Sequence, residues 1–192
     1  MPVTRLINVG GNAVANIVTT ANAGASRSAN VVTITTTANH NFSAGQAVTV
    51  AGVADATFNG TFTIASVPTG TTFTYAQNGS NGTSQSGTAT PGFVSISSSI
   101  PSRRVEVRED EGTAVGLQYQ KPEDSFTAIF SCATPAGPDQ AQIVLGNVVG
   151  HGHGYGNLLG LPAQPNGATA TVLLKVRAKS NATTNIRVTE IE

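Results

Sequence analysis

The chain has 192 residues, of which only 10% are charged, and its ten basic and ten acidic side chains give a formal net charge of zero. This balance of charge argues against nucleic acid as the main ligand, because neutralising a phosphate backbone needs a basic face. The 39% hydrophobic content is compatible with a folded core, and no stretch approaches the roughly 20 apolar residues that span a membrane.

The N-terminal region shows little strand pattern. Residues 1–10 contain no apolar run behind a basic start, so we expect no secretory signal peptide. Residues 8–30 are rich in Gly, Asn and Ala, a composition typical of a segment that becomes ordered only on binding. We therefore predict an N-terminal arm, and expect that deletion of residues 1–25 leaves a folded protein that no longer attaches to its partner.

A charge-poor segment divides the chain. Between Arg27 and Arg103 the only charged residue is Asp55. This shift in composition predicts a separate module of residues 30–90, inserted into a main domain formed by residues 1–29 and 91–192.

Within the module, apolar residues alternate with Thr or Ser in four segments, 31–37, 47–50, 61–67 and 72–75. Alternation with period two and β-branched Thr are typical of strands, and Gly, Asn and Pro clusters separate the segments. We predict a small antiparallel β-barrel or immunoglobulin-like sandwich. Its expected core residues are Val32, Ile34, Phe42, Val48, Val50, Phe58, Phe62, Ile64, Val67, Phe73 and Tyr75.

The remainder of the chain is also rich in predicted strands. The segments that alternate are 93–97, 104–108, 116–120, 125–130 and 184–191. Residues 142–145 and 171–177 are more continuously apolar and are predicted as buried strands. The sequence therefore predicts an all-β protein whose main domain is a β-sandwich or a jelly-roll-like fold.

The Gly-rich segment 150–157 contains His151 and His153. Side chains at i and i+2 project to the same side of a strand, so this pair could hold zinc, iron or nickel, and a trimer would bring three pairs to one axis. Four glycines in the same segment favour a flexible loop that packs against a neighbouring subunit. His151 and His153 are therefore the less favoured, metal-binding alternative.

Other residues with reactive side chains are assigned structural roles. His40 is predicted to cap a turn, and residues 109–112 to form a solvated hairpin turn rather than a calcium site. Arg103 and Arg104 are expected to flank these carboxylates, the alternative being that they pair with acidic residues of a partner. Cys132 is the only cysteine and is predicted to be a small buried hydrophobic residue. Neither a Gly-x-Ser-x-Gly elbow nor a phosphate loop is present, so we expect a protein that is not an enzyme and uses no cofactor.

Three segments of the module, 32–52, 58–64 and 71–75, carry the text TA-H-F--G--V-V-G, FNGTF-I and TTFTY. This text resembles a recurring small β module of structural proteins of tailed bacteriophages and their prophages. The resemblance implies a structural protein of the virion, made in the host cytoplasm, that forms a homo-oligomer such as a trimer and binds the major capsid protein or a tail protein.

Within this class the expected function is decoration of the head by binding to the capsid lattice. The alternative is a tail- or fibre-associated adhesin that contacts host surface polysaccharide. The sequence offers an adhesin few aromatic side chains for stacking on sugars, since it has three Tyr and no Trp.

Overall fold

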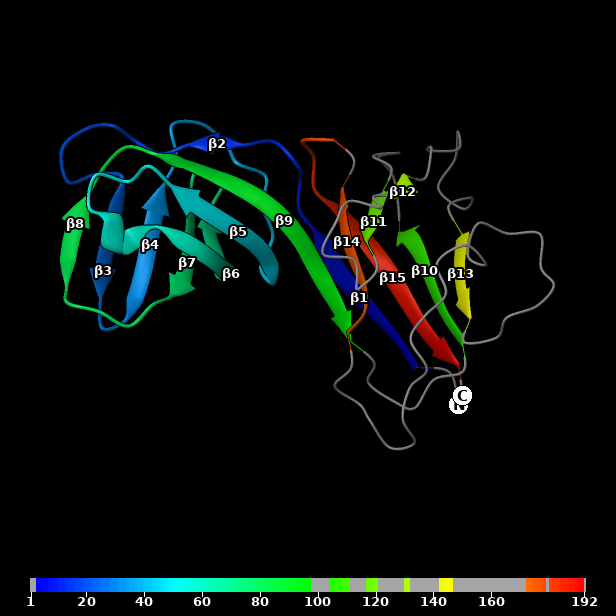
Figure 1. Cartoon of the computed structure of the whole chain (residues 1–192). Helices are drawn as coiled ribbons and strands as arrows, with labels where there is room; N and C mark the ends of the chain where they lie inside the picture. Colours follow the sequence, from blue (N-terminus) through cyan, green and yellow to red (C-terminus); the bar gives the residue numbers. More distant parts are fainter. Residues whose placement is uncertain are drawn as a thin grey trace. The chain divides into compact units, whose positions relative to one another are not determined.

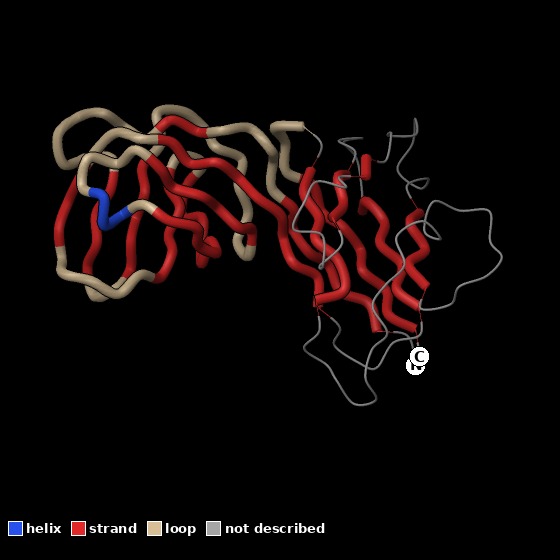
Figure 2. Tube along the Cα trace, in the orientation of Figure 1, coloured by secondary structure: helices blue, strands red, loops and turns tan. Residues whose placement is uncertain are grey.

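The computed structural model describes residues 3–97, 104–110, 117–120, 130–131, 142–146, 172–178 and 180–191. Within these residues the structure is nearly all β and contains no α-helix. A single 3-10 turn, η1 (Ala56–Phe58), is drawn in blue in Figure 2. The prediction of an all-β fold is confirmed.

The chain forms two compact units, each of which is discontinuous in sequence. The first, here called the inserted unit, consists of residues 10–94 and 180–183. The second, here called the terminal unit, consists of residues 1–9, 95–179 and 184–192. Strand β9 (Thr88–Ser97) contributes residues to both units.

The inserted unit begins about twenty residues before the predicted module, and its two N-terminal strands occupy the region expected to be an arm. Strand β2 (Ala15–Asn16) pairs with β9, and β3 (Ala25–Ser28) pairs with strands on both sides. The arm prediction is therefore wrong for these residues. The strand signal is weak because β3 reads Ala-Ser-Arg-Ser and buries an arginine, Arg27, in place of an apolar side chain.

The described strands of the inserted unit form an antiparallel sheet in the order β9-β5-β6-β7-β4-β3-β8, with β2 paired to β9. The sheet is curled into a half-barrel, as Figure 1 shows. The strands not yet given bounds are β4 (Val31–Thr35), β5 (Gln46–Ala51), β6 (Gly60–Thr69), β7 (Thr72–Ala76) and β8 (Gly82–Ser84). The alternating Thr-rich segments predicted as strands correspond to β4, β5, β6 and β7.

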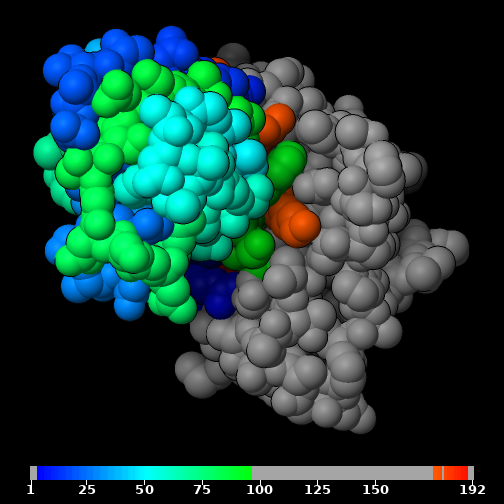
Figure 3. Space-filling view, turned by 60° about the vertical axis from the view of Figure 1, so that its left-hand side comes forward, coloured from blue at the N-terminus to red at the C-terminus, as the bar shows by residue number. Residues whose placement is uncertain are grey.

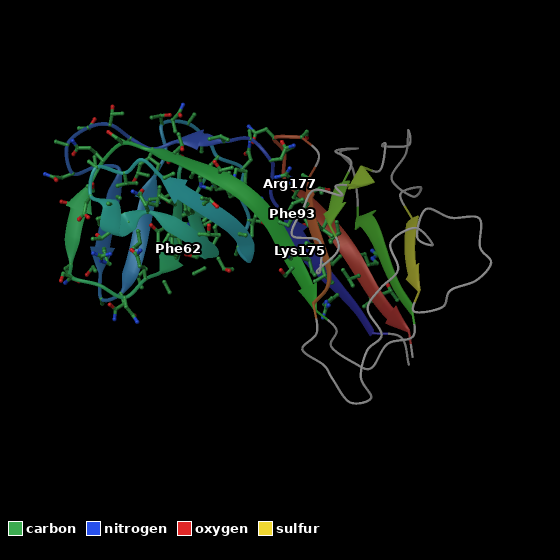
Figure 4. All side chains as sticks on the ribbon, in the orientation of Figure 1. Phe62, Phe93, Lys175 and Arg177 are labelled. Carbon is green, nitrogen blue, oxygen red and sulfur yellow. The ribbon has the colours of Figure 1, made fainter. Side chains whose placement is uncertain are left out.

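The core of the inserted unit lies on the inner face of this sheet. Nine of the eleven predicted core residues are buried, and Phe62 and Val67 pack against them partly exposed. Phe62, labelled on β6 in Figure 4, stacks on Tyr75 with ring centroids 4.0 Å apart. The Tyr75 hydroxyl donates to the Phe58 carbonyl at 2.9 Å, and burial raises the pKa of Tyr75, so it remains a donor. The core also contains Ile17, Ala25, Val53 and Ala89, which the sequence prediction omits.

The terminal unit contains a four-stranded antiparallel sheet among its described residues, in the order β1-β15-β10-β13. Strand β15 (Thr184–Ile191) pairs along its length with β1 (Val3–Val9) on one side and β10 (Arg104–Asp110) on the other. Strand β10 also pairs with β13 (Gln142–Gly146). The central position of β15 explains why the side chains of Ile186 and Val188 are fully buried.

A second set of strands in the terminal unit has β11 (Leu117–Gln120) between β12 (Phe130–Ser131) and β14 (Val172–Ala178). Lys175 and Arg177 of β14, labelled in Figure 4, alternate with buried Val176 and Ala178. The strands predicted in this part of the chain are confirmed where they fall on described residues. Among the described residues, no helix has the length and hydropathy needed to cross a membrane.

Candidate functional site

Several residues that the sequence analysis assigned to candidate sites lie outside the described residues. These are His151, His153, Cys132, Arg103 and Glu111. The metal and loop-packing interpretations of His151 and His153 therefore stay predictions. The described part of the chain contains no group of three or more His, Cys, Asp or Glu residues that could hold a metal ion.

The acidic segment predicted as a hairpin turn begins inside a strand. Glu109 and Asp110 are the last two residues of β10 and pair with Ile186 and Asn185 of β15. Arg104 is the first residue of the same strand. The hairpin-turn prediction is wrong for Glu109 and Asp110, because the pairing with β15 extends the strand beyond the alternating segment 104–108.

His40 caps a turn, as predicted. The Phe42 N–H donates to Nδ1 of His40 at 2.9 Å, and the imidazole is only 2% exposed. Its ring packs against those of Phe42 and Phe73, with centroids 4.6 and 5.4 Å away. Burial lowers the pKa of His40, an effect that the Thr72 main chain partly opposes. A neutral imidazole that accepts from a backbone N–H is thus part of the fold.

Gln46, the first residue of β5, is fully buried and bonds three backbone groups. Its Oε1 accepts from the Ser43 N–H at 3.1 Å, and its Nε2 donates to the carbonyls of Gly11 and Gly92 at 3.0 Å each. A Cβ at position 10 would overlap Oε1, so Gly10 is needed for this close approach. Gln46 therefore joins the start of β5 to the N-terminal segment and to β9.

Arg27 is the buried charged residue of the inserted unit, with 6% of its surface exposed. Its Nε donates to the Ser80 carbonyl at 2.7 Å, Nη1 to Gln77 Oε1 at 2.9 Å and Nη2 to Thr57 Oγ1 at 3.2 Å. The guanidinium carbon also lies 4.8 Å from the centroid of the Phe58 ring, in cation–π geometry. These contacts hold the guanidinium under the loop that follows β7.

Arg27 forms one wall of a pocket of about 310 Å³. The described residues that line it are Arg27, Asp55, Thr57, Asn78, Gly79, Ser80, Asn81 and Gly82. They come from β3, from η1 with the residue before it, and from the loop leading into β8 together with the first residue of β8. Figure 3 shows the segment around residue 55 (cyan) beside the segment around residue 80 (green) on the face in view.

The pocket contains both formally charged residues of the inserted unit, Arg27 and Asp55. Asp55 caps η1: its Oδ1 accepts from the Thr57 N–H at 2.9 Å. Hydrogen bonds from the Thr57 hydroxyl and N–H, with a smaller contribution from the Arg27 charge, lower the pKa of this exposed carboxyl. Since the Thr57 hydroxyl also accepts from Arg27, it links the two opposite charges through one oxygen. The sequence signal for this site is that two isolated charges occur in a segment otherwise without them.

The outer face of the inserted sheet carries hydroxyl groups at directly opposed positions on five adjacent strands. This hydroxyl row consists of Thr83, Ser26, Thr33, Thr74 and Ser66. The Ser66 and Thr74 hydroxyls are 2.7 Å apart, and a second cross-strand pair, Thr49 and Thr61, has its hydroxyls 3.0 Å apart. Alternation along each strand points most of the neighbouring apolar side chains to the core, with Val31 of β4 exposed on the same face as Thr33, so this face is uncharged and mostly polar.

Comparison with known proteins finds no matching family, no matching curated protein and no matching solved structure.

Proposed function

We propose that this chain is a non-enzymatic structural protein of a tailed-bacteriophage virion, and that it decorates the head by binding to the capsid lattice. The observation that supports this proposal is that the buried polar side chains of the inserted unit hydrogen-bond to the surrounding backbone and loops. Gln46 bonds three main-chain groups, His40 caps a turn, and Arg27 uses three hydrogen bonds to fasten surrounding segments. Such hydrogen bonds fix the turns and strand ends around the core, which suits a rigid scaffold.

The outer surface of the inserted unit supports a protruding position. Its hydroxyl row carries no formal charge, and the two charges of the unit are both at one pocket. An uncharged face that carries hydroxyl groups stays hydrated, and it attracts charged partners of either sign only weakly. The terminal unit then supplies the anchoring surface, since alternate positions of β10, from Arg104 to Asp110, are charged.

The proposal includes the remaining expectations from the resemblance. The partners are the major capsid protein or a tail protein, and the chain assembles as a homo-oligomer such as a trimer in the virion, after synthesis in the host cytoplasm. Closed cyclic assemblies are the commonest arrangement for such components.

A second candidate is a tail- or fibre-associated adhesin that contacts host surface polysaccharide. The specific observation that favours it is the pocket at Arg27, which is lined by loop residues with amide, hydroxyl and carboxylate groups. Polar groups of this kind recognise the hydroxyls of sugars.

The copy number of the chain in purified particles tests the proposal and separates the two candidates. Quantitative mass spectrometry would measure the ratio of this chain to the major capsid protein. We expect a ratio comparable to one chain per capsid subunit or per symmetry axis of the capsid. A few copies per particle would instead favour the adhesin, and complete absence from particles would overturn the virion assignment.

A further inference from the structure

We infer that the pocket at Arg27 binds a neutral polyhydroxylated ligand of the size of one sugar ring. This inference concerns the inserted unit alone. It supplies a ligand class for the adhesin candidate. Its test uses the purified protein, so the result does not depend on whether the chain lies in the head or the tail of a virion.

The pocket offers hydrogen-bond donors that the fold leaves available. A guanidinium has five N–H groups, and Arg27 uses three of them for Ser80, Gln77 and Thr57. One N–H on Nη1 and one on Nη2 therefore have no acceptor among the described residues. The Asn81 side chain accepts from the Ala29 N–H through Oδ1, which leaves its NH₂ group as a further donor.

The pocket also offers acceptors. Asp55 is exposed and uses Oδ1 to cap η1, and a carboxylate can accept more hydrogen bonds than this one. The Asn78 side chain, which lines the same pocket, makes no hydrogen bond with a described residue and can both donate and accept. Adjacent hydroxyls of a sugar ring each donate and accept, which matches a site that presents both kinds of group within a short distance.

The charges of the pocket argue for a neutral ligand. A free anion such as sulfate would meet Arg27 but also the Asp55 carboxylate, and a free cation would meet the guanidinium. Hydrogen bonds to Thr57 lower the pKa of Asp55, so the carboxylate is ionised at neutral pH and this balance of charge is maintained. A polyol uses both groups without the cost of desolvating a second charge.

The size and lining of the pocket limit the ligand and its affinity. About 310 Å³ lies at the small end of ligand sites, which suits one ring. None of the eight residues described as lining it is aromatic, so ring stacking does not contribute. We therefore expect a dissociation constant on the order of millimolar for one site. Many copies on a particle would raise the overall avidity.

Two glycines that line the pocket, Gly79 and Gly82, show which substitutions can test ligand binding there. A Cβ at position 79 would lie 2.7 Å from Arg27 Cζ, so Gly79 allows the loop to rest on the guanidinium. A Cβ at position 82 would meet no atom within 4 Å, so Gly82 borders open space. Gly82 lies directly opposite Arg27 in the β3–β8 pair, so a side chain at this position lies on the same face as Arg27. The variant G82Q therefore places a side chain at the pocket without a steric clash at its first atom, whereas any change at Gly79 would also move Arg27.

The test is a titration of the full-length, ¹⁵N-labelled protein, followed by amide chemical shifts. The probes are the methyl glycosides of glucose, galactose, mannose and N-acetylglucosamine, with sodium sulfate and glycine at matched concentrations. We expect saturable shifts for amides of residues 55–57 and 78–82 with at least one glycoside, and none with sulfate or glycine.

Two pocket variants and one control locate the binding. G82Q should weaken glycoside binding at least tenfold by occupying the pocket. D55N keeps a side chain that can cap η1 but removes the charged acceptor, and should weaken binding about tenfold. The control T63Q places the same new side chain at an exposed position of β6 and should bind like the wild type.

Each other result overturns the inference. Shifts at the pocket with sulfate alone would show an anion site, and shifts with glycine alone a site for zwitterions. Absence of saturable shifts with every glycoside, or glycoside shifts that persist unchanged in both G82Q and D55N, would show that the pocket does not bind sugars. The spectrum of each variant away from the pocket reports whether the fold is retained. None of these outcomes bears on the copy number in particles, so failure of this inference can be distinguished from failure of the proposed function.

Discussion

The inserted unit buries several polar side chains, among them Arg27, His40 and Gln46. Burial of a polar group is unfavourable unless its hydrogen bonds are replaced, and each of these residues makes at least one such bond, although His40 Nε2 is buried without one. The resulting contacts connect loops that the apolar core does not reach. At the scale of single residues, these buried polar side chains therefore hold the surrounding backbone and side chains in place.

His40 should make stability depend on pH. Its pKa is lowered in the folded protein by burial, so in acid the unfolded chain binds a proton more readily than the folded one. Stability is therefore fully present above the unfolded value of about 6.5 and declines as the pH falls below it. Protonation of Nδ1 would also remove the acceptor for the Phe42 N–H. Urea unfolding of the wild type at pH 7.5 and 5.0 measures this loss.

The control for His40 is the variant H40N, whose side-chain oxygen can still accept from a backbone N–H two residues away. It removes the titrating group, so the other ionisable residues contribute equally to both proteins. We expect the wild type to lose more stability than H40N between the two pH values, because only the wild type takes up a proton at this position on unfolding. An equal loss in both proteins would contradict this account.

At the scale of elements, the curled sheet of the inserted unit is stabilised differently on its two faces. The inner face buries aromatic and β-branched side chains, including Phe58, Phe73 and Ile34. The outer face joins strands through exposed hydroxyl pairs such as Thr49 with Thr61. Cross-strand pairs of this type contribute roughly 0.2–1 kcal/mol each, so the inner face dominates the stability. The outer face can therefore vary at small cost.

Gln46 joins three elements, and its removal should be costly. In Q46A the Ser43 N–H and the carbonyls of Gly11 and Gly92 lose their partner in a buried position. We expect a loss of about 3 kcal/mol in the free energy of unfolding. The matched control T49A breaks an exposed hydroxyl pair and should cost less than about 1 kcal/mol. Urea unfolding of both variants gives the comparison, and similar costs would show that the Gln46 bonds contribute little.

At the scale of the whole molecule, both units are assembled from segments distant in sequence. In the terminal unit, β1 pairs with β15, which brings the two ends of the described chain together, with Val3 opposite Glu190. In the inserted unit, the Asn12 N–H donates to the Ser180 carbonyl at 3.2 Å, and Asn41 Nδ2 donates to the Asn181 carbonyl at 2.9 Å. Deletion of residues 1–25 would remove β1 and β2, and we now expect it to disrupt both units.

The boundaries of the inserted unit can be tested with two fragments. Residues 10–94 contain every residue of its core cluster, so this fragment should give a dispersed NMR spectrum and a cooperative unfolding transition. Residues 30–90 lack Ile17 and Ala25 of the core and lack β3, which pairs with both β4 and β8. That shorter fragment should not fold cooperatively. Cooperative folding of both fragments would place the N-terminal boundary at residue 30, where the sequence predicts it.

Local pattern alone determined the all-β class, the four Thr-rich strands and most of the core of the inserted unit. These follow from alternation of apolar and hydroxyl side chains, which reports the two faces of a strand without knowledge of its neighbours. The turn-capping role of His40 was also predictable, because it depends on a backbone group two residues away.

Only the tertiary structure decided which distant residues meet. Strand β3 has little apolar pattern, and it becomes a strand because β4 and β8 both pair with it. The bonds of Gln46 and the meeting of Arg27 with Asp55, Thr57 and the loop 78–82 join residues up to 55 positions apart, and no local periodicity encodes such a separation. Pairing and burial between distant segments thus set the unit boundaries and built the pocket, while the strands themselves were already encoded in local sequence.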